Sequence, residues 1–218
     1  MHEFCRKGQE LYCESVRLRS LAEQFGTPLY VYSQTTFERQ YRALESALQP
    51  LNPMLCYAVK ANSNLAVLRT FARLGAGFDI VSQGELQRVM AAGGDPAKCV
   101  FAGVGKTEAE IEAALRAGLF CINVESEAEL HRIDRTAGRM KQVAPVAVRV
   151  NPNVDAATHA KITTGTYENK FGIVLDDVPS VYARAAKLRH VRLCGVQMHI
   201  GSQIASAAPF ELAVRRML

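Results

Sequence analysis

The fold of this 218-residue chain is decided by Met54–Asn62, MLCYAVKAN. Residues 54–59 carry no charge and lie between Pro53 and a polar turn, a pattern typical of a buried strand. Lys60 closes the run, and a parallel α/β barrel places its chemistry at the carboxyl ends of its strands. A partly desolvated amine there can attack a carbonyl group and form a Schiff base. An isolated lysine at a strand end, however, more often just extends its ammonium group into water.

Downstream of this run, short apolar segments alternate with amphipathic ones. The predicted strands are residues 54–59, 78–81, 98–102, 119–124, 144–150 and 191–198. The predicted helices are residues 64–74, 83–92, 107–117, 126–139 and 176–188, with Thr107 and Ser126 as candidate N-caps. Alternating strands and helices with right-handed crossovers form a parallel sheet, and the short, even repeat favours a (β/α)8 barrel of the TIM type over a doubly wound sheet.

The predicted barrel is incomplete. Only about six strands fit the sequence, whereas a closed barrel of this type has eight. The last helical pattern, residues 209–218, ends on the apolar Leu218, so we expect a barrel truncated at its C-terminal side. Residues 1–34 hold a strand-like Leu11-Tyr12, a helix around 15–25 and an alternating strand at 29–32, which do not fit the repeat. We therefore expect residues 1–34 to contribute to a second, β-rich domain and residues 35–218 to form the barrel.

Composition excludes several classes of protein. The formal net charge is +5, and the basic residues are scattered, which gives no indication of nucleic-acid binding. No apolar run is long enough to span a membrane, and the start of the chain has no signal-peptide core, so we expect a cytoplasmic protein. Six cysteines, four of them inside predicted strands, include no Cys-x-x-Cys pair. We interpret them as free buried thiols and expect no metal site.

Six segments spread along the chain form a set. They are GTPLYVY (26–32), YAVKANSN (57–64), GFDIVSQGEL (77–86), VGKT (104–107), ENKFGI (168–173) and HIGSQ (199–203). In content and order the set resembles the alanine-racemase-like pyridoxal-phosphate decarboxylases, and within them the diaminopimelate decarboxylase branch. Singly most of these motifs are weak, but together they cover nearly the whole chain and are highly specific.

The resemblance implies a homodimeric enzyme with shared active sites that uses pyridoxal 5'-phosphate to decarboxylate meso-2,6-diaminopimelate to L-lysine, in lysine biosynthesis. It implies that Lys60 forms the Schiff base with the cofactor, that His199 stacks on the cofactor ring and that Ser202 hydrogen-bonds the phosphate. Asp79 and Arg149 are implied to line the site near the ring. Periodicity independently places all five at or just beyond predicted strand ends.

Each of these residues also has an ordinary structural interpretation. His199 can be a satisfied structural histidine, Asp79 can cap the following turn, and Arg149 can be a surface charge at a strand end. Glu85, in the first turn of its helix, fits a cap as well as a functional role. The segment 151–171 is long for a βα connection and is typical of a lid over a site.

One segment resembles a phosphate-binding motif without matching it. Residues 99–107, CVFAGVGKT, imitate a phosphate-binding P-loop, but that motif needs a glycine where this chain has Val100. We therefore predict no nucleotide site there.

Three rival functions share part of the pattern. A sister decarboxylase acting on arginine, ornithine or carboxynorspermidine shares the lysine and histidine motifs, but residues 168–173 and 201–203 favour the diaminopimelate branch. Alanine racemases typically continue with Tyr-Gly-His-Gly, and here Ser63-Asn64-Leu65 follows the lysine motif. The third rival is an inactive fragment or a non-catalytic cofactor-binding barrel. The family's phosphate loop and the acid that partners the ring nitrogen lie downstream of this half, so we expect the 218 residues alone to be inactive.

Overall fold

The computed structural model describes residues 3–154, 171–202 and 204–218. Its main element, within that part of the chain, is a parallel sheet with the strand order β10-β8-β7-β6-β5-β4 and β9 beside β8. The strands are β4 (Cys56–Ala58), β5 (Gly77–Ile80), β6 (Cys99–Phe101), β7 (Cys121–Val124), β8 (Ala144–Asn151), β9 (Ile173–Val174) and β10 (Val191–Gln197). All six predicted strands are confirmed: four are shorter than predicted, β5 is shifted by one residue and β8 is one residue longer. The strand β9 was not predicted.

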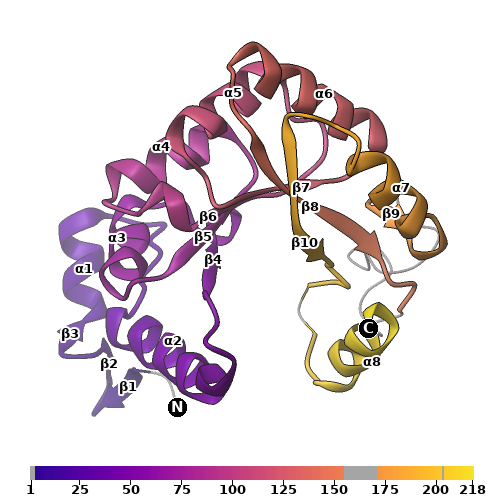
Figure 1. The fold of residues 1–218 in the computed structure, drawn as a ribbon. Coiled ribbons are helices and arrows are strands. Elements are labelled where there is room, and N and C mark those ends of the chain that lie inside the picture. Colours follow the sequence, from indigo (N-terminus) through magenta and orange to yellow (C-terminus); the bar gives the residue numbers. More distant parts are fainter. Residues whose placement is uncertain (1–2, 155–170, 203) are drawn as a thin grey trace.

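Helices cover the outer face of this sheet, which curves into an arch (Figure 1). They are α3 (Leu65–Arg73), α4 (Gln83–Ala91), α5 (Glu108–Ala117), α6 (Glu127–Arg139) and α7 (Val178–Ala185). A parallel sheet with one helix per crossover, open between β4 and β10, is part of a (β/α) barrel, as predicted.

Local sequence explains where these helices begin. The Thr107 hydroxyl accepts from the Glu110 amide, and the Glu110 carboxylate accepts from the Thr107 amide, which is a complete capping box. The Ser126 hydroxyl accepts from the Glu129 amide at the start of α6. Both predicted caps are confirmed.

Strand alternation separates the core from the interior of the barrel. Phe78 and Ile80 of β5 are fully buried among the helices, together with Phe101 of β6 and Ile122 of β7. Complete burial of such a side chain stabilises the fold by roughly 1.5–3 kcal/mol. The alternate position, Asp79, lies on the inner face of the arch.

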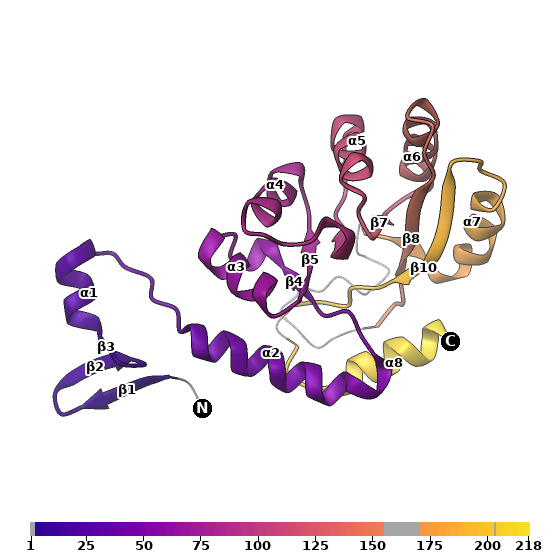
Figure 2. The same ribbon diagram turned by 60° about the vertical axis from the view of Figure 1, so that its left-hand side comes forward.

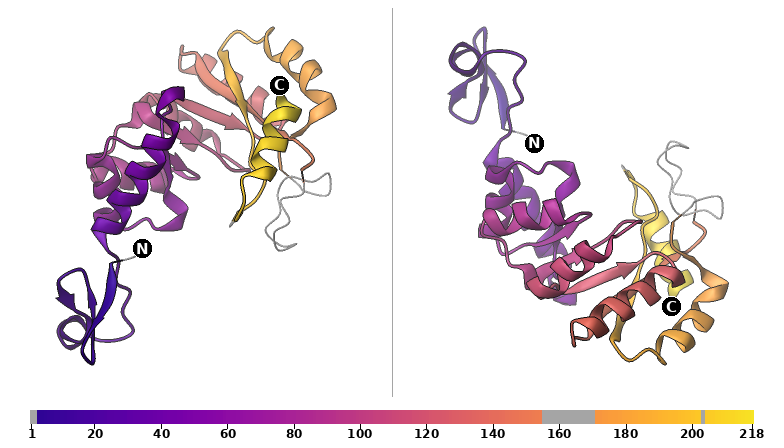
Figure 3. Two further views of the ribbon diagram at one scale, coloured as in Figure 1. Left: turned by 90° about the horizontal axis from the view of Figure 1, so that it is seen from below. Right: turned by 90° about the horizontal axis from the view of Figure 1, so that it is seen from above.

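The N-terminal segment forms a separate small unit. An antiparallel sheet of β1 (Phe4–Lys7), β2 (Glu10–Cys13) and β3 (Val16–Arg17) leads into α1 (Leu18–Phe25). An extended stretch joins this unit to the barrel, and the unit projects from one end of the molecule (Figures 2 and 3). Its assignment to a second domain stays a prediction. The strand expected at residues 29–32 is wrong, because this stretch pairs with no described strand.

Two further helices flank the sheet. The sequence did not predict α2 (Gln34–Leu48), which packs Phe37 and Tyr41 against the core beside α3. The predicted helix at the end of the chain is α8 (Ala208–Met217), whose Ala213 is buried with Val154 and Ile200 beyond the ends of β8 and β10.

The cysteines follow the expectation in part. All six are free, and burial raises the pKa of Cys99 and of Cys121 to about 12 each. Cys194 was expected to be buried in its strand, but it is exposed because β10 is an edge strand of the described sheet. None of the described helices is long and apolar enough to cross a bilayer.

Candidate active site

Strand register brings the predicted site residues to one edge of the sheet. Ala58 of β4 pairs with Asp79 of β5, and Lys60 follows two residues beyond Ala58. At the other side of the arch, Arg149 of β8 pairs with Gln197 of β10, two residues before His199. All these strands are parallel, so the four side chains share the carboxyl edge, where such barrels hold their chemistry.

Lys60 lies in a 3-10 turn, Val59–Ala61, rather than at the end of the strand itself. Val59 is fully buried and anchors the turn, while the Tyr57 hydroxyl donates to the Asn62 carbonyl at 3.2 Å. Lys60 is exposed among the described residues, and the expected partial desolvation of its amine stays a prediction. An exposed primary amine beside a half-buried carboxylate is accessible to an incoming carbonyl compound.

Asp79 is half-buried and poorly satisfied. Its Oδ1 is inaccessible to solvent and has no hydrogen-bond partner among the described residues. Burial raises the pKa of the Asp79 carboxyl, and the nearby positive charges of Lys60 and Arg149 oppose that rise. Asp79 does not cap α4, because the Ser82 hydroxyl accepts from the Glu85 amide there. An orphaned carboxylate oxygen in a site is a candidate group for binding a ligand.

Glu85 has the structural role that the sequence left open. Its Oε2 accepts from the Val81 amide at 2.8 Å, so the side chain secures the chain where it enters α4.

Arg149 is not the surface charge that its strand-end position allowed. Only 8% of the residue is exposed, and its Nη1 donates to both carboxylate oxygens of Glu125, at 2.8 and 3.0 Å. Glu125, which directly follows β7, was missed at the sequence level. Its position one residue beyond the predicted strand 119–124 was the available signal, because barrels of this type hold their chemistry at the carboxyl ends of their strands.

His199 is half-buried directly beyond β10. Burial lowers the pKa of its imidazole, and the positive charges of Arg149 and Lys60 lower it further, while Glu125 raises it. The ring is therefore held in its neutral form at neutral pH, which suits stacking on another flat ring.

Ser202 lies three residues beyond His199 on the same segment and is exposed. Within the described part of the chain it forms no hydrogen bond, and so none with the other four residues. The adjoining Gln203, and residues 168–170 of the ENKFGI motif, lie outside the described residues.

The lysine of the P-loop-like segment, Lys106, is hydrogen-bonded within the protein. Lys106 Nζ donates to the carbonyls of Gly103 and Asn123 and to Glu129 Oε1, at 2.6, 2.8 and 2.9 Å. With its donors engaged in this way and the residue 2% exposed, Lys106 is not available to a phosphate group. This supports the prediction that no nucleotide binds there.

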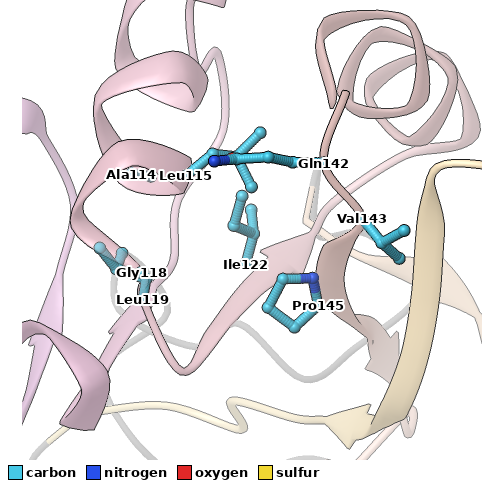
Figure 4. Close-up of a pocket in the computed structure, with 8 residues that line it drawn as sticks. All are labelled: Ala114, Leu115, Gly118, Leu119, Ile122, Gln142, Val143 and Pro145. Carbon is cyan, nitrogen blue, oxygen red and sulfur yellow. The ribbon is translucent and has the colours of Figure 1, made fainter. Parts of the chain in front are cut away.

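Neither a metal cluster nor the pocket at the amino edge of the sheet offers a competing centre among the described residues. The residues described include no cluster of three or more His, Cys, Asp or Glu side chains arranged for a metal ion. A separate pocket lies at the opposite, amino edge of the sheet, between α5 and the turn that enters β8 (Figure 4). Gln142 is its single polar side chain, and the rest of the lining includes Leu119, Ile122 and Val143. It contains no group suited to acid–base or nucleophilic chemistry.

Comparison with known proteins identifies the family. Residues 34–218 match the family model described as pyridoxal-dependent decarboxylase, pyridoxal binding domain. The chain belongs to this family. It is 56% identical over 218 residues to the diaminopimelate decarboxylase of Pseudomonas aeruginosa, a match that covers 100% of this chain and 52% of that protein. It is 54% identical over 209 residues to the diaminopimelate decarboxylase of Vibrio cholerae, covering 96% and 50%.

Solved decarboxylase structures share the fold. The crystal structure of diaminopimelate decarboxylase from M. jannaschii in complex with L-lysine matches with a TM-score of 0.91 and 36% identity, over 98% of this chain and 51% of that one. The chain thus spans about half the length of the decarboxylases that it matches.

Proposed function

We propose that the complete protein decarboxylates meso-2,6-diaminopimelate to L-lysine and carbon dioxide with pyridoxal 5'-phosphate. The observation that carries the proposal is the meeting of Lys60, Asp79, Arg149 and His199 at one carboxyl edge, in a chain of the pyridoxal-dependent decarboxylase family. The identity to diaminopimelate decarboxylases supports the choice of substrate.

The described residues fit the cofactor. Lys60 offers an exposed amine for its aldehyde carbon, and the neutral ring of His199 offers a flat surface for the pyridine ring. The buried, unpartnered Oδ1 of Asp79 is a polar atom that a bound ligand could satisfy. Ser202 presents a hydroxyl without a described partner, as a phosphate ligand requires. Bound pyridoxal phosphate supplies an electron sink for the carbanion that remains after loss of carbon dioxide.

The roles of the protein side chains follow from their charges. Lys60 would hold the cofactor at its aldehyde carbon, and its amine would carry the proton that replaces the carboxylate. The positive charges of Lys60 and Arg149 oppose the rise that burial causes in the pKa of Asp79, and they attract the carboxylate groups of the zwitterionic substrate.

We further propose a homodimer with shared active sites. Lys60 and Ser202 are both exposed, so the described residues alone do not exclude water from the site. Exclusion of water protects a carbanion from premature protonation. The missing walls then come from the rest of the protein and from a partner subunit.

The test is turnover of the complete protein with pyridoxal phosphate on meso-diaminopimelate and on ornithine. A site that hydrogen-bonds the distal carboxylate and amine should prefer meso-diaminopimelate by a factor on the order of 10⁴ in kcat/KM, because ornithine leaves buried polar groups unpaired. Comparable kcat/KM values for the two substrates would move the protein to the sister decarboxylases. Failure to turn over meso-diaminopimelate, ornithine, arginine and carboxynorspermidine alike would favour the non-catalytic rival.

A further inference from the structure

Three groups that the proposed chemistry does not use enclose the Arg149 side chain. Glu125 accepts from its Nη1 at 2.8 and 3.0 Å. The ring of Phe171 lies across the guanidinium, with 5.2 Å between the Arg149 Cζ and the ring centroid. Gly172 packs against the Arg149 backbone and the base of its side chain. We call Glu125, Phe171 and Gly172 the arginine clamp.

The clamp has space for glycine alone at position 172. The backbone of Gly172 has φ +79°, a conformation that residues other than glycine rarely adopt. A Cβ there would lie 3.0 Å from the Arg149 carbonyl oxygen and 3.1 Å from the Arg149 Cγ. Any larger residue would therefore push the base of the arginine side chain away from its present place.

Glu125 is itself held from behind. Its Oε1 accepts from the Gly103 amide at 3.1 Å, and its own amide donates to Glu129 Oε2 at 2.7 Å. Glu129 is in turn paired with Lys106 at 2.9 Å. The Glu125 carboxylate that binds Arg149 is therefore fixed in position by the loop after β6, by the end of β7 and by α6.

We propose that Glu125, Phe171 and Gly172 are positioning residues that fix the Arg149 guanidinium beside His199 and Asp79 at the carboxyl edge. The inference deepens the proposed function and rests on it for its meaning in catalysis. It assigns a physical purpose to the Phe-Gly pair of the ENKFGI motif, which the sequence identified only as a family signature. Phe171 supplies a cation–π face, and Gly172 supplies the space for the arginine.

A fixed cation at this place has a measurable consequence. Among the described residues, the charged groups that act on His199 are Arg149 from β8, Lys60 from the turn after β4 and Glu125 after β7. Arg149 lowers the pKa of His199, so displacing the guanidinium should let that pKa rise toward the value of free histidine. Substitutions in the clamp that change no charge are the sharpest probe, because Glu125 itself raises the pKa of His199.

The experiment compares Gly172→Ala with Gly118→Ala in the complete, cofactor-free protein. Gly118 also has a positive φ, +69°, but a Cβ there meets nothing within 4 Å. It therefore reproduces the backbone strain without touching Arg149. NMR titration of ¹⁵N-histidine-labelled protein reports the pKa of His199, with the signal assigned by its loss in His199→Gln.

We expect a raised His199 pKa in Gly172→Ala, an unchanged one in Gly118→Ala, and a smaller rise in Phe171→Leu, which keeps the apolar bulk but removes the ring face. With cofactor, kcat/KM of Gly172→Ala should fall by about 10²-fold, as for a catalytic group misplaced by about 1 Å. If Gly172→Ala does not fold, Phe171→Leu carries the test.

An unchanged His199 pKa in the folded clamp variants would overturn the inference. The titration uses no substrate, so its result is independent of the proposed function. A raised pKa in a protein that does not decarboxylate meso-diaminopimelate would keep the clamp and reject the function.

Discussion

Replacing Lys106 with methionine should destabilise the protein more than the loss of any surface ion pair. Methionine keeps the apolar stem but removes the charge and the three hydrogen bonds to Gly103, Asn123 and Glu129. The side chains of Lys106 and Glu129 are 1% and 6% exposed, so water cannot replace the lost ammonium group.

The magnitude follows from that burial. Removing one partner of a buried pair costs about 3–5 kcal/mol, because an uncompensated charge stays in the interior. On α5, Arg116 and Glu112 lie 3.0 Å apart, but their side chains are 67% and 30% exposed. An exposed pair of this kind contributes about 0.2–1 kcal/mol, so Arg116→Met serves as the matched control.

Urea unfolding of the complete protein measures both costs. The double variant Lys106→Met, Glu129→Leu should recover part of the loss, because it removes both buried charges together. If Lys106→Met costs no more than Arg116→Met, or if the double variant is less stable than the sum of its single changes, the reasoning about the buried pair is wrong.

Three further changes test other parts of the fold. Asp79→Asn should stabilise the cofactor-free protein at neutral pH and have little effect in acid. Burial raises the pKa of Asp79, so the stability that this carboxyl contributes is fully present below its ordinary pKa and is lost as the pH rises through the pKa of the folded state. An equal gain in the free energy of unfolding at acid and neutral pH, measured by urea unfolding, would contradict this. Thr107→Ala should cost about 1 kcal/mol in urea unfolding by removing the capping box of α5, whereas Thr107→Ser should cost little in the same assay. Gly77→Ala would place a Cβ 2.5 Å from the Lys98 carbonyl oxygen and should cost about 1–3 kcal/mol. The control Gly84→Ala should be tolerated, because a Cβ there has its nearest neighbour at 3.8 Å. Equal unfolding midpoints of the two variants would count against the packing argument.

The barrel repeat was predictable because its signals are local. Each strand is a short apolar run, and each helix after it begins at a cap such as Thr107 or Ser126. The carboxyl-edge rule then placed Lys60, Asp79, Arg149 and His199 together without a structure.

The features that the sequence did not predict depend on contacts between distant segments, or on local patterns that were not interpreted. The helix α2 carries Phe37, Tyr41 and Leu44 at helical spacing, a pattern that was available but not interpreted. Alternation at residues 29–32 predicted a strand, yet pairing needs a neighbour that the described residues do not supply. The Lys106–Glu129 pair joins two units of the repeat, so no local pattern reveals it.

The side chain that holds the cofactor is the central claim, and one measurement tests it most directly. The complete protein is incubated with pyridoxal phosphate, reduced with borohydride and digested, and the modified peptide is identified by mass spectrometry. The account predicts that the pyridoxyl group is attached to Lys60 and that Lys60→Ala abolishes both the labelling and the visible absorption. Lys187→Ala, which removes an exposed lysine in the turn after α7, should change neither. Stoichiometric labelling of a different lysine in the wild-type protein, or undiminished labelling in Lys60→Ala, would contradict it.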